Sequence, residues 1–350
     1  MDPVLTTLIV LLVLATALGL IQAYKRDPCL SDFDDFHVTL AEQDGDLCWG
    51  NAEIYSTGME ITYVEPVRAP EGHPEYSFIF YKDQYTALDA LYRYADGLTE
   101  EQRARRDAVI ERTAHPGLLR RMGRRLRNWV GMVRDALLQA VSMVLGFVKT
   151  RAPGTAVLSS QEAQIKALSS EVIGHVGNAF DPLLERHLFS KVVLEVTRQG
   201  KKYSYCGWLK NYSSRFIEVV DAQANSTDTR LPLQEYTVDD PRMAGLKVTI
   251  RVEAGRLGIV NESAHVLYVR SVEAGAWSRP MGCVLPPGYT ADLVLPPEAD
   301  PRSARVWIGA IDRFDMVAPR THAIVRHAAE PPDQRALFAL PSRSKAPEPT

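Results

Sequence analysis

A long apolar run occupies the start of the chain. Residues 4–24 contain 21 residues without a charge. A helix of that length spans about 30 Å, which is the hydrocarbon thickness of a bilayer. Asp2 precedes the run, while Lys25 and Arg26 follow it directly, and basic flanks favour the cytoplasm. The pattern predicts a transmembrane anchor over residues 1–27, retained rather than cleaved because no basic residue precedes it.

Two later stretches alternate between apolar and polar residues with the period of β-strands. In the first, residues 28–83, Val38 and Leu40 lead into a hairpin-turn signal at residues 43–46 (QDGD). The second, residues 191–243, shows the same alternation around a longer turn. Each stretch is predicted to form a small barrel-like β domain.

The two stretches share the spacing of their landmarks, which predicts an internal repeat. The glycine that follows each turn is typical of a bulge or sharp bend in a strongly curved sheet. A chance match between two bent meanders is the alternative. The landmarks are Val38, Gly45, Gly50 and Tyr55-Ser56 in the first stretch and Val193, Gly200, Gly207 and Tyr212-Ser213 in the second.

This layout resembles small SH3-like or Sm-like barrels, over roughly 30 residues of each copy. The resemblance concerns the order of hairpin, bent strand, turn and strand, and it rests on no signature motif. It implies a protein that mediates assembly. Sm-like barrels also form RNA-binding rings, but their RNA-contact residues have no position-by-position match here, so RNA binding is not implied.

The segment between the two stretches, residues 84–190, is predicted to be helical. Apolar residues from Tyr85 to Tyr92 share one face of a helix expected over residues 84–112. Within it, Thr99 and Gln102 have the spacing of a capping box. Later in the segment, a further helix is expected, and an Asp-Pro pair starts a short one before the second β stretch.

Residues 117–149 combine a basic start with an apolar stripe at helical spacing. Such a helix can lie in the plane of an anionic membrane surface, which is the favoured interpretation. A second membrane span and a core or oligomer-forming helix are alternatives, and the basic cluster could instead bind nucleic acid. The predicted membrane-surface contacts are Arg120, Arg121, Arg124, Arg125, Arg127 and Trp129.

Short strands separated by turns return after residue 244. Alternation from Val248 to Val252 and a Pro-Pro-Gly turn at residues 286–288 predict a β-sandwich over residues 244–330. The pattern resembles immunoglobulin-like accessory domains of bacterial proteins. Residues 331–350 are rich in proline and polar residues and are predicted to be a disordered tail.

Composition adds little chemistry to this picture. The net charge of −3 predicts no nucleic-acid partner, and 46% hydrophobic residues are typical of packed domains. The four cysteines fit no zinc or disulfide framework. No catalytic motif occurs, and His322 and His327 are spaced so that they fall on opposite faces of a strand. We therefore expect neither an enzyme nor a bound cofactor.

Together these patterns predict an α+β fold with an N-terminal transmembrane helix, two small β-barrel-like domains separated by helices, and a C-terminal β-sandwich. The corresponding function is a non-enzymatic scaffold or accessory subunit of a bacterial membrane complex. It would be a single-pass inner-membrane protein with its body in the cytoplasm. Its partners would be the lipid bilayer, other subunits of the complex and further copies of itself. The alternative is a membrane-tethered nucleic-acid-binding protein that uses the arginine-rich helix.

Overall fold

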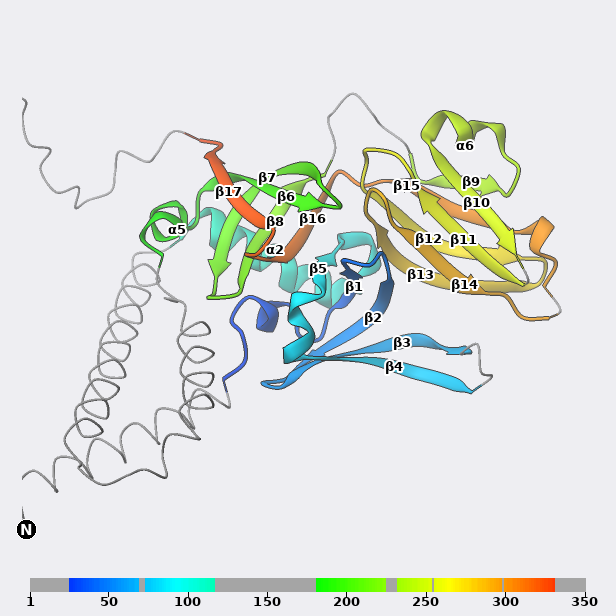
Figure 1. Cartoon of the computed structure of the whole chain (residues 1–350), viewed down its shortest axis with the longest axis horizontal. Helices are drawn as coiled ribbons and strands as arrows, with labels where there is room; N and C mark the ends of the chain where they lie inside the picture. Colours follow the sequence, from blue (N-terminus) through cyan, green and yellow to red (C-terminus); the bar gives the residue numbers. More distant parts are fainter. Residues whose placement is uncertain are drawn as a thin grey trace, which may run out of the picture.

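Strands dominate the computed structural model of the protein (Figure 1). They form three sheets of ten, three and four strands. The structure describes residues 25–68, 73–116, 181–224, 232–253, 255–297 and 299–330.

The first half of the ten-stranded sheet is a five-stranded unit, called unit 1 here. Its strands are hydrogen-bonded in the order β5-β1-β2-β3-β4. Its core is closed by the helical turn η1, whose Leu30 and Phe33 are fully buried. The elements are η1 (Leu30–Phe33), β1 (His37–Glu42), β2 (Leu47–Ile54), β3 (Gly58–Arg68), β4 (Pro74–Tyr81), η2 (Lys82–Thr86) and β5 (Leu88–Arg93).

The second half, unit 2, repeats this arrangement strand for strand. The order β17-β6-β7-β8-β16 makes β6, β7, β8, β16 and β17 the counterparts of β1 to β5. A short helix, α5, precedes unit 2 as η1 precedes unit 1. The elements are α5 (Pro182–His187), β6 (Lys191–Arg198), β7 (Lys201–Tyr212), β8 (Phe216–Gln223), β16 (Arg313–Pro319) and β17 (Ala323–Ala328).

The two units join through antiparallel pairing of β16 with β5, which makes one continuous sheet. Side-chain packing also crosses this junction, because Phe216 and Val317 of unit 2 belong to the core of unit 1. Two separate barrel-like domains were expected, and that expectation is wrong. Sequence alternation reports which residues are buried, but it does not report that the last strand of one unit pairs with a strand of the other.

The register confirms the repeat and moves its alignment by one residue. Val38 pairs with Gly50 in unit 1, while Val192 pairs with Gly207 in unit 2. Val192, and not Val193, is therefore the counterpart of Val38. The difference arises because the β6–β7 hairpin is longer than the β1–β2 hairpin.

The two aligned glycines allow neighbouring strands to approach closely. A Cβ atom on Gly50 would lie 2.1 Å from the carbonyl oxygen of Thr62, and one on Gly207 would lie 2.7 Å from the Cα atom of Ala222. Both contacts are with the backbone of the adjacent strand. Glycine is required at both positions because a side chain would collide with the adjacent strand, and not because of the backbone conformation, since neither residue has a positive φ.

A seven-stranded β-sandwich is inserted between β8 and β16 (Figure 1). Its sheets have the orders β10-β11-β14 and β13-β12-β15-β9. In unit 1 the equivalent connection is the β3–β4 hairpin. The elements are β9 (Gln234–Thr237), α6 (Pro241–Leu246), β10 (Val248–Glu253), β11 (Arg256–Asn261), β12 (Leu267–Ala274), β13 (Trp277–Leu285), β14 (Thr290–Val294), η4 (Pro301–Ser303) and β15 (Arg305–Ala310).

This sandwich does not have the limits expected for it, residues 244–330. It begins ten residues earlier, at Gln234, and ends with β15. The apolar residues Ile324 and Val325 belong to β17 of unit 2. Apolar and polar residues alternate in the same way in the sandwich and in the ten-stranded sheet. The sequence therefore does not show where the chain passes from β15 of the sandwich to β16 of the ten-stranded sheet.

The helix expected over residues 84–112 is only partly present. Its second half forms α2 (Glu100–Ala114), and Thr99 and Gln102 make the predicted capping box. The first half is η2 followed by strand β5 and the short turn η3 (Ala95–Gly97). Every residue of β5 is buried on both faces. An apolar run buried on both sides has no two-residue alternation and can be mistaken for a helix.

The membrane-anchored α+β class is corrected to a mostly β fold. Over the part of the chain described above, no helix is long and apolar enough to cross a membrane. The expected anchor at residues 4–24, the basic helix at 117–149 and the tail at 331–350 lie outside the described residues. The assignment as a single-pass inner-membrane protein with a cytoplasmic body is withdrawn with the fold class on which it rested.

Candidate interaction surface

The contact residues predicted from sequence cannot be placed in a site. Arg120, Arg121, Arg124, Arg125, Arg127 and Trp129 lie outside the described residues. Among the described residues, the candidate features are buried charge, one small pocket and exposed apolar surface.

Buried charge is concentrated at the junction of the two units. Asp315 of β16 lies directly opposite Arg93 of β5 and accepts a hydrogen bond from its Nε at 2.9 Å. Arg106 of α2 donates two further bonds to the same carboxylate, at 2.7 and 2.9 Å. Burial alone would raise the pKa of Asp315, but the two guanidinium groups outweigh burial and lower it. The cluster therefore holds β5, β16 and α2 together.

Aromatic rings complete the environment of Arg93. Its guanidinium lies 4.4 Å from the ring centre of Phe33 and 4.3 Å from that of Phe36. It also donates to the backbone carbonyl of Asp32 at 2.9 Å. Cation–π contact and hydrogen bonding offset the cost of burying this charge.

A second ionic cluster links the other end of β5 with unit 2. Arg198 of β6 is buried and donates to Asp89 of β5 at 2.5 Å and to the hydroxyl groups of Tyr92 and Tyr205. His322, in the turn before β17, contacts the Asp89 carboxylate at 3.3 Å. Burial would raise the pKa of Asp89, but His322 and Arg198 together lower it. This cluster is a structural connection between the units.

A third cluster joins Lys210, Asp32 and Glu218. The Lys210 ammonium lies 2.6 Å from Asp32 and 2.9 Å from Glu218, which is completely buried. Burial raises the pKa of Glu218 well above its usual range, even though Lys210 opposes the shift. Each buried charge in these clusters has an internal partner of opposite sign. Among the described residues, no group of three or more His, Cys, Asp or Glu could hold a metal ion.

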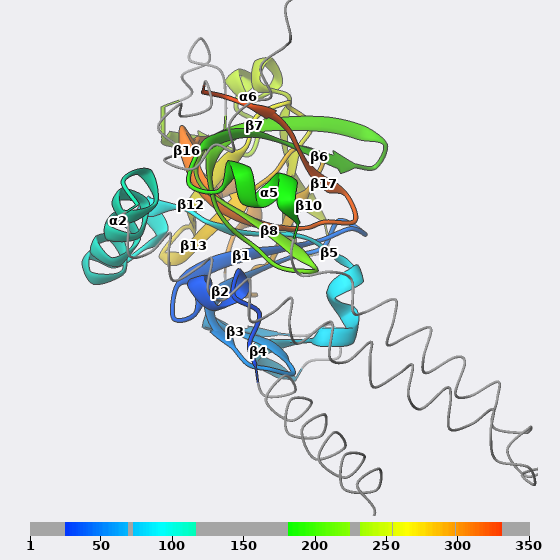
Figure 2. The same cartoon turned by 90° about the vertical axis from the view of Figure 1, so that its left-hand side faces the viewer.

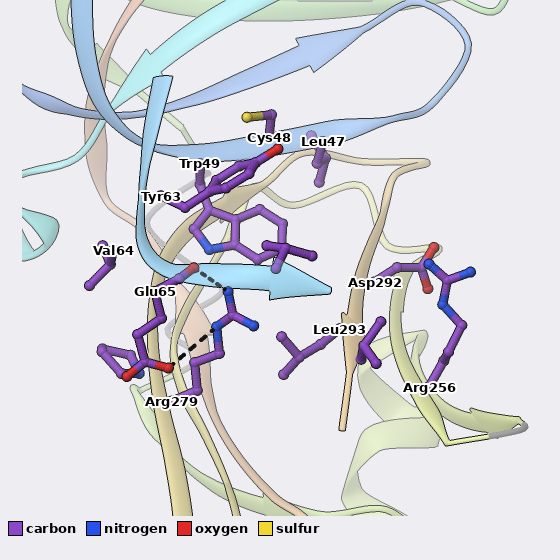
Figure 3. A pocket seen from close by; sticks show the side chains of 13 residues that line it. Leu47, Cys48, Trp49, Tyr63, Val64, Glu65, Arg256, Arg279, Asp292 and Leu293 are labelled. Atoms are coloured by element: carbon purple, nitrogen blue, oxygen red, sulfur yellow. Dashed lines mark hydrogen bonds and ion pairs between the residues drawn. The ribbon is translucent and has the colours of Figure 1, made fainter. Parts of the chain in front are cut away.

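One small pocket lies between unit 1 and the sandwich (Figure 3). Its volume is about 110 Å³, and Trp49 and Tyr63 face Leu293 across it. Arg279 donates to the backbone carbonyl of Glu65 at 3.1 Å and lies 3.9 Å from its carboxylate. The pocket is small and its buried arginine is occupied, so it serves to pack the β3–β4 hairpin against the sandwich.

The remaining feature is at the ends of the ten-stranded sheet. Strands β4 and β17 are its edge strands, and they lie at opposite ends of it in both views (Figures 1 and 2). β4 pairs only with β3, and β17 pairs only with β6, among the described strands. Each edge therefore presents a row of backbone groups that no described strand pairs with.

Exposed apolar side chains gather at these edges. Tyr76, Ile79 and Tyr81 of β4 are 63%, 52% and 55% exposed, and Ile324 of β17 is 43% exposed. The strands at the internal junction are different, because six of the seven residues of β16 and all of β5 are buried. The two edges are the candidate interaction surface.

Sequence patterns identified these strands only in part. The alternation of Tyr76, Phe78 and Phe80 indicated a strand, but it could not show that the strand has no outer neighbour. Ile324 was assigned to the sandwich. An edge strand is defined by pairing over long sequence distances, and no local pattern reports that.

Comparisons with known proteins identify no relative. No family model matches the chain, and neither a curated protein nor a solved structure is significantly similar to it.

Proposed function

We propose that this protein is a non-enzymatic scaffold or accessory subunit that binds other polypeptides at the edges of its ten-stranded sheet. The observation that carries the proposal is the edge strand β4, with Tyr76, Ile79 and Tyr81 exposed. Binding would occur by strand addition, in which backbone hydrogen bonds supply affinity and alternate side chains supply specificity.

Edge strands of monomeric proteins are commonly protected by charge, proline or a bulge. The exposed part of β4 from Tyr76 to Tyr81 includes no charged residue and no proline, and its pairing with β3 is regular from Ser77 to Tyr81. An apolar edge of this kind is a site for association with another chain. The exposure of this edge in the isolated chain supports the proposal that a partner covers it.

The distribution of exposed apolar side chains favours the same surface. Seven large hydrophobic residues are exposed in the described part of the chain, and three of them lie on β4. A fourth, Val64, is on the neighbouring strand β3, and none is in the sandwich. The sandwich therefore offers no comparable apolar surface.

A site-specific cross-linker tests the proposal. A photoreactive amino acid is placed at Ile79 in the full chain, and illumination is carried out in the cells that make the protein. The matched control carries the cross-linker at Leu183, which is 74% exposed and lies on the helix α5 rather than on an edge strand. We expect discrete adducts with polypeptide from position 79 and none of them from position 183. If position 79 gives no polypeptide adduct, the proposed function is wrong.

A further inference from the structure

We propose that the polypeptide bound at these edges is a second copy of this chain, with β4 of one molecule paired to β17 of the next. This inference rests on the proposed function and specifies its partner. The internal junction shows how the pairing would be built: β16 is the fourth strand of unit 2, and it pairs with β5, the fifth strand of unit 1. The strands left over are the fourth of unit 1, β4, and the fifth of unit 2, β17.

The repeat supplies the residue equivalences on the fourth strands. The turn before β3 is closed by a bond from Tyr55 N to Gly58 O, and the turn before β8 by one from Ser213 N to Phe216 O. Gly58 thus corresponds to Phe216, one residue later than the aligned glycines alone would give, because the register of β7 shifts between Leu209 and Asn211. Two residues further along these strands, Glu60 pairs with Ile79 in unit 1, and Glu218 pairs with Val317 in unit 2. Ile79 is therefore the counterpart of Val317.

The same comparison applies to the fifth strands. Leu40 of β1 pairs with Leu91, and Leu194 of β6 pairs with Val325. Leu40 and Leu194 are counterparts, since each lies two residues after the valine paired with the aligned glycine. Val325 is thus the counterpart of Leu91.

These equivalences fix the register between molecules. Val317 lies opposite Leu91 at the internal junction, so Ile79 should lie opposite Val325 of the next molecule. Val317 and Leu91 are both 0% exposed, whereas Ile79 is 52% exposed and Val325 is half-buried. Pairing would place the apolar side chain of Ile79 in the environment that Val317 already has.

The contact between molecules would be weaker than the internal junction. The position of Asp315 in unit 2 is occupied by Ser77 in unit 1, because Met316 and Phe78 are counterparts. The intermolecular contact therefore lacks the buried carboxylate that binds Arg93 and Arg106. We therefore expect the contact between molecules to be reversible. The two units at the internal junction, in contrast, belong to one covalent chain and cannot separate by dissociation.

The proposed contact uses two different surfaces and is therefore heterologous. Each molecule offers one β4 and one β17, so association continues until a ring closes or an open chain forms. A mutation that blocks one edge would leave the other edge of the same molecule able to bind. This property distinguishes the arrangement from a two-fold dimer, in which identical edges meet.

Engineered cysteines test both the partner and the register. Full-length Ile79→Cys and Val325→Cys proteins are prepared separately, mixed and oxidised, beside the parent with its native cysteines. We expect a disulfide-linked dimer in the mixture and none in either variant alone or in the parent. The double variant should give a ladder of dimers, trimers and larger species.

The matched control pairs Ile79→Cys with Ile324→Cys. Ile324 is the neighbour of Val325, so its side chain points to the opposite face of β17, and we expect much less dimer. Equal dimer yield from residues 324 and 325 would refute the register. If no dimer forms in any mixture while the cross-linker at Ile79 still captures a different protein, the inference is wrong and the proposed function stands. If neither a cysteine-linked dimer nor an adduct at Ile79 forms, both the inference and the proposed function are wrong.

Discussion

Arg93 and Asp315 are 222 residues apart in the sequence and lie directly opposite one another on β5 and β16, with their charged groups 2.9 Å apart. Their side chains are 1% and 0% exposed. The pair lies at the one place where the two five-stranded units meet edge to edge. It therefore fixes how unit 2 continues the sheet of unit 1.

Asp315→Asn should destabilise the fold severely. The substitution leaves the guanidinium groups of Arg93 and Arg106 buried without a counter-charge, and breaking one partner of a buried pair costs about 3–5 kcal/mol. Chemical denaturation followed by tryptophan fluorescence would measure the loss. Arg313→Gln is the matched control, because its 2.6 Å pair with Asp221 involves a side chain that is 61% exposed and should cost at most about 1 kcal/mol. Equal losses for the two variants would contradict the role assigned to the junction.

Sequence alone could predict local structure where one face of an element meets solvent. The turn at Gly45, the Thr99 capping box and the start of α5 at Pro182 all follow local rules and are present. The repeat was also detectable, because both units need a glycine where adjacent strands approach closely. The alignment was off by one residue because the hairpins differ in length.

Features that depend on distant pairing could not be predicted. The sequence of β5 predicts a helix because burial on both faces removes the alternation that identifies a strand. The return of the chain from the sandwich to β16 was missed for a related reason, since Phe314 and Met316 are buried like sandwich residues. β4 is an edge strand because no other described strand pairs with its outer side. The residues of β4 alone do not predict this.

Gly50→Ala should be destabilising although Gly50 has an ordinary φ. The added Cβ would lie 2.1 Å from the carbonyl oxygen of Thr62, and forcing strands apart in a packed core costs about 1–3 kcal/mol. Gly245→Ala in α6 is the control, because nothing lies within 4 Å of its added Cβ and alanine is favoured over glycine in helices by up to about 1 kcal/mol. The shift in thermal midpoint would be compared for the two proteins. A neutral Gly50→Ala would contradict the close approach of β2 and β3 at this position.

Thr99→Ala should weaken the start of α2. The Thr99 hydroxyl accepts from the backbone N–H of Gln102, and the Gln102 side chain also donates to the Asp35 carbonyl. Loss of an N-cap side chain costs about 1 kcal/mol. Thr99→Ser retains the acceptor and should keep most of the stability. Hydrogen exchange of the first-turn amides of α2 would report the change directly, and unchanged protection in Thr99→Ala would contradict the cap.

His37 should make the attachment of the sandwich to unit 1 dependent on pH. It is 8% exposed on β1, and its Nε2 donates to the carbonyl of Gly282 on β13 at 3.1 Å. Burial lowers the pKa of His37, and hydrogen bonds to backbone carbonyls only partly oppose the shift. The folded protein therefore holds His37 neutral at pH values where the unfolded chain has begun to bind a proton. The unfolded state then binds more protons, so stability is lost as the pH falls below about 6.5, with a limiting slope of about 1.4 kcal/mol per pH unit.

His37→Gln keeps a donor for the Gly282 carbonyl and removes the titration. Unfolding free energies measured between pH 7.5 and pH 5 should fall less steeply for this variant than for the parent. His73→Gln serves as the control, because its side chain is 60% exposed, and its profile should follow that of the parent. If His37→Gln and the parent lose stability in parallel over this range, the pH dependence comes from other groups. A matching slope would also mean that the β1–β13 contact does not require a neutral imidazole at this position.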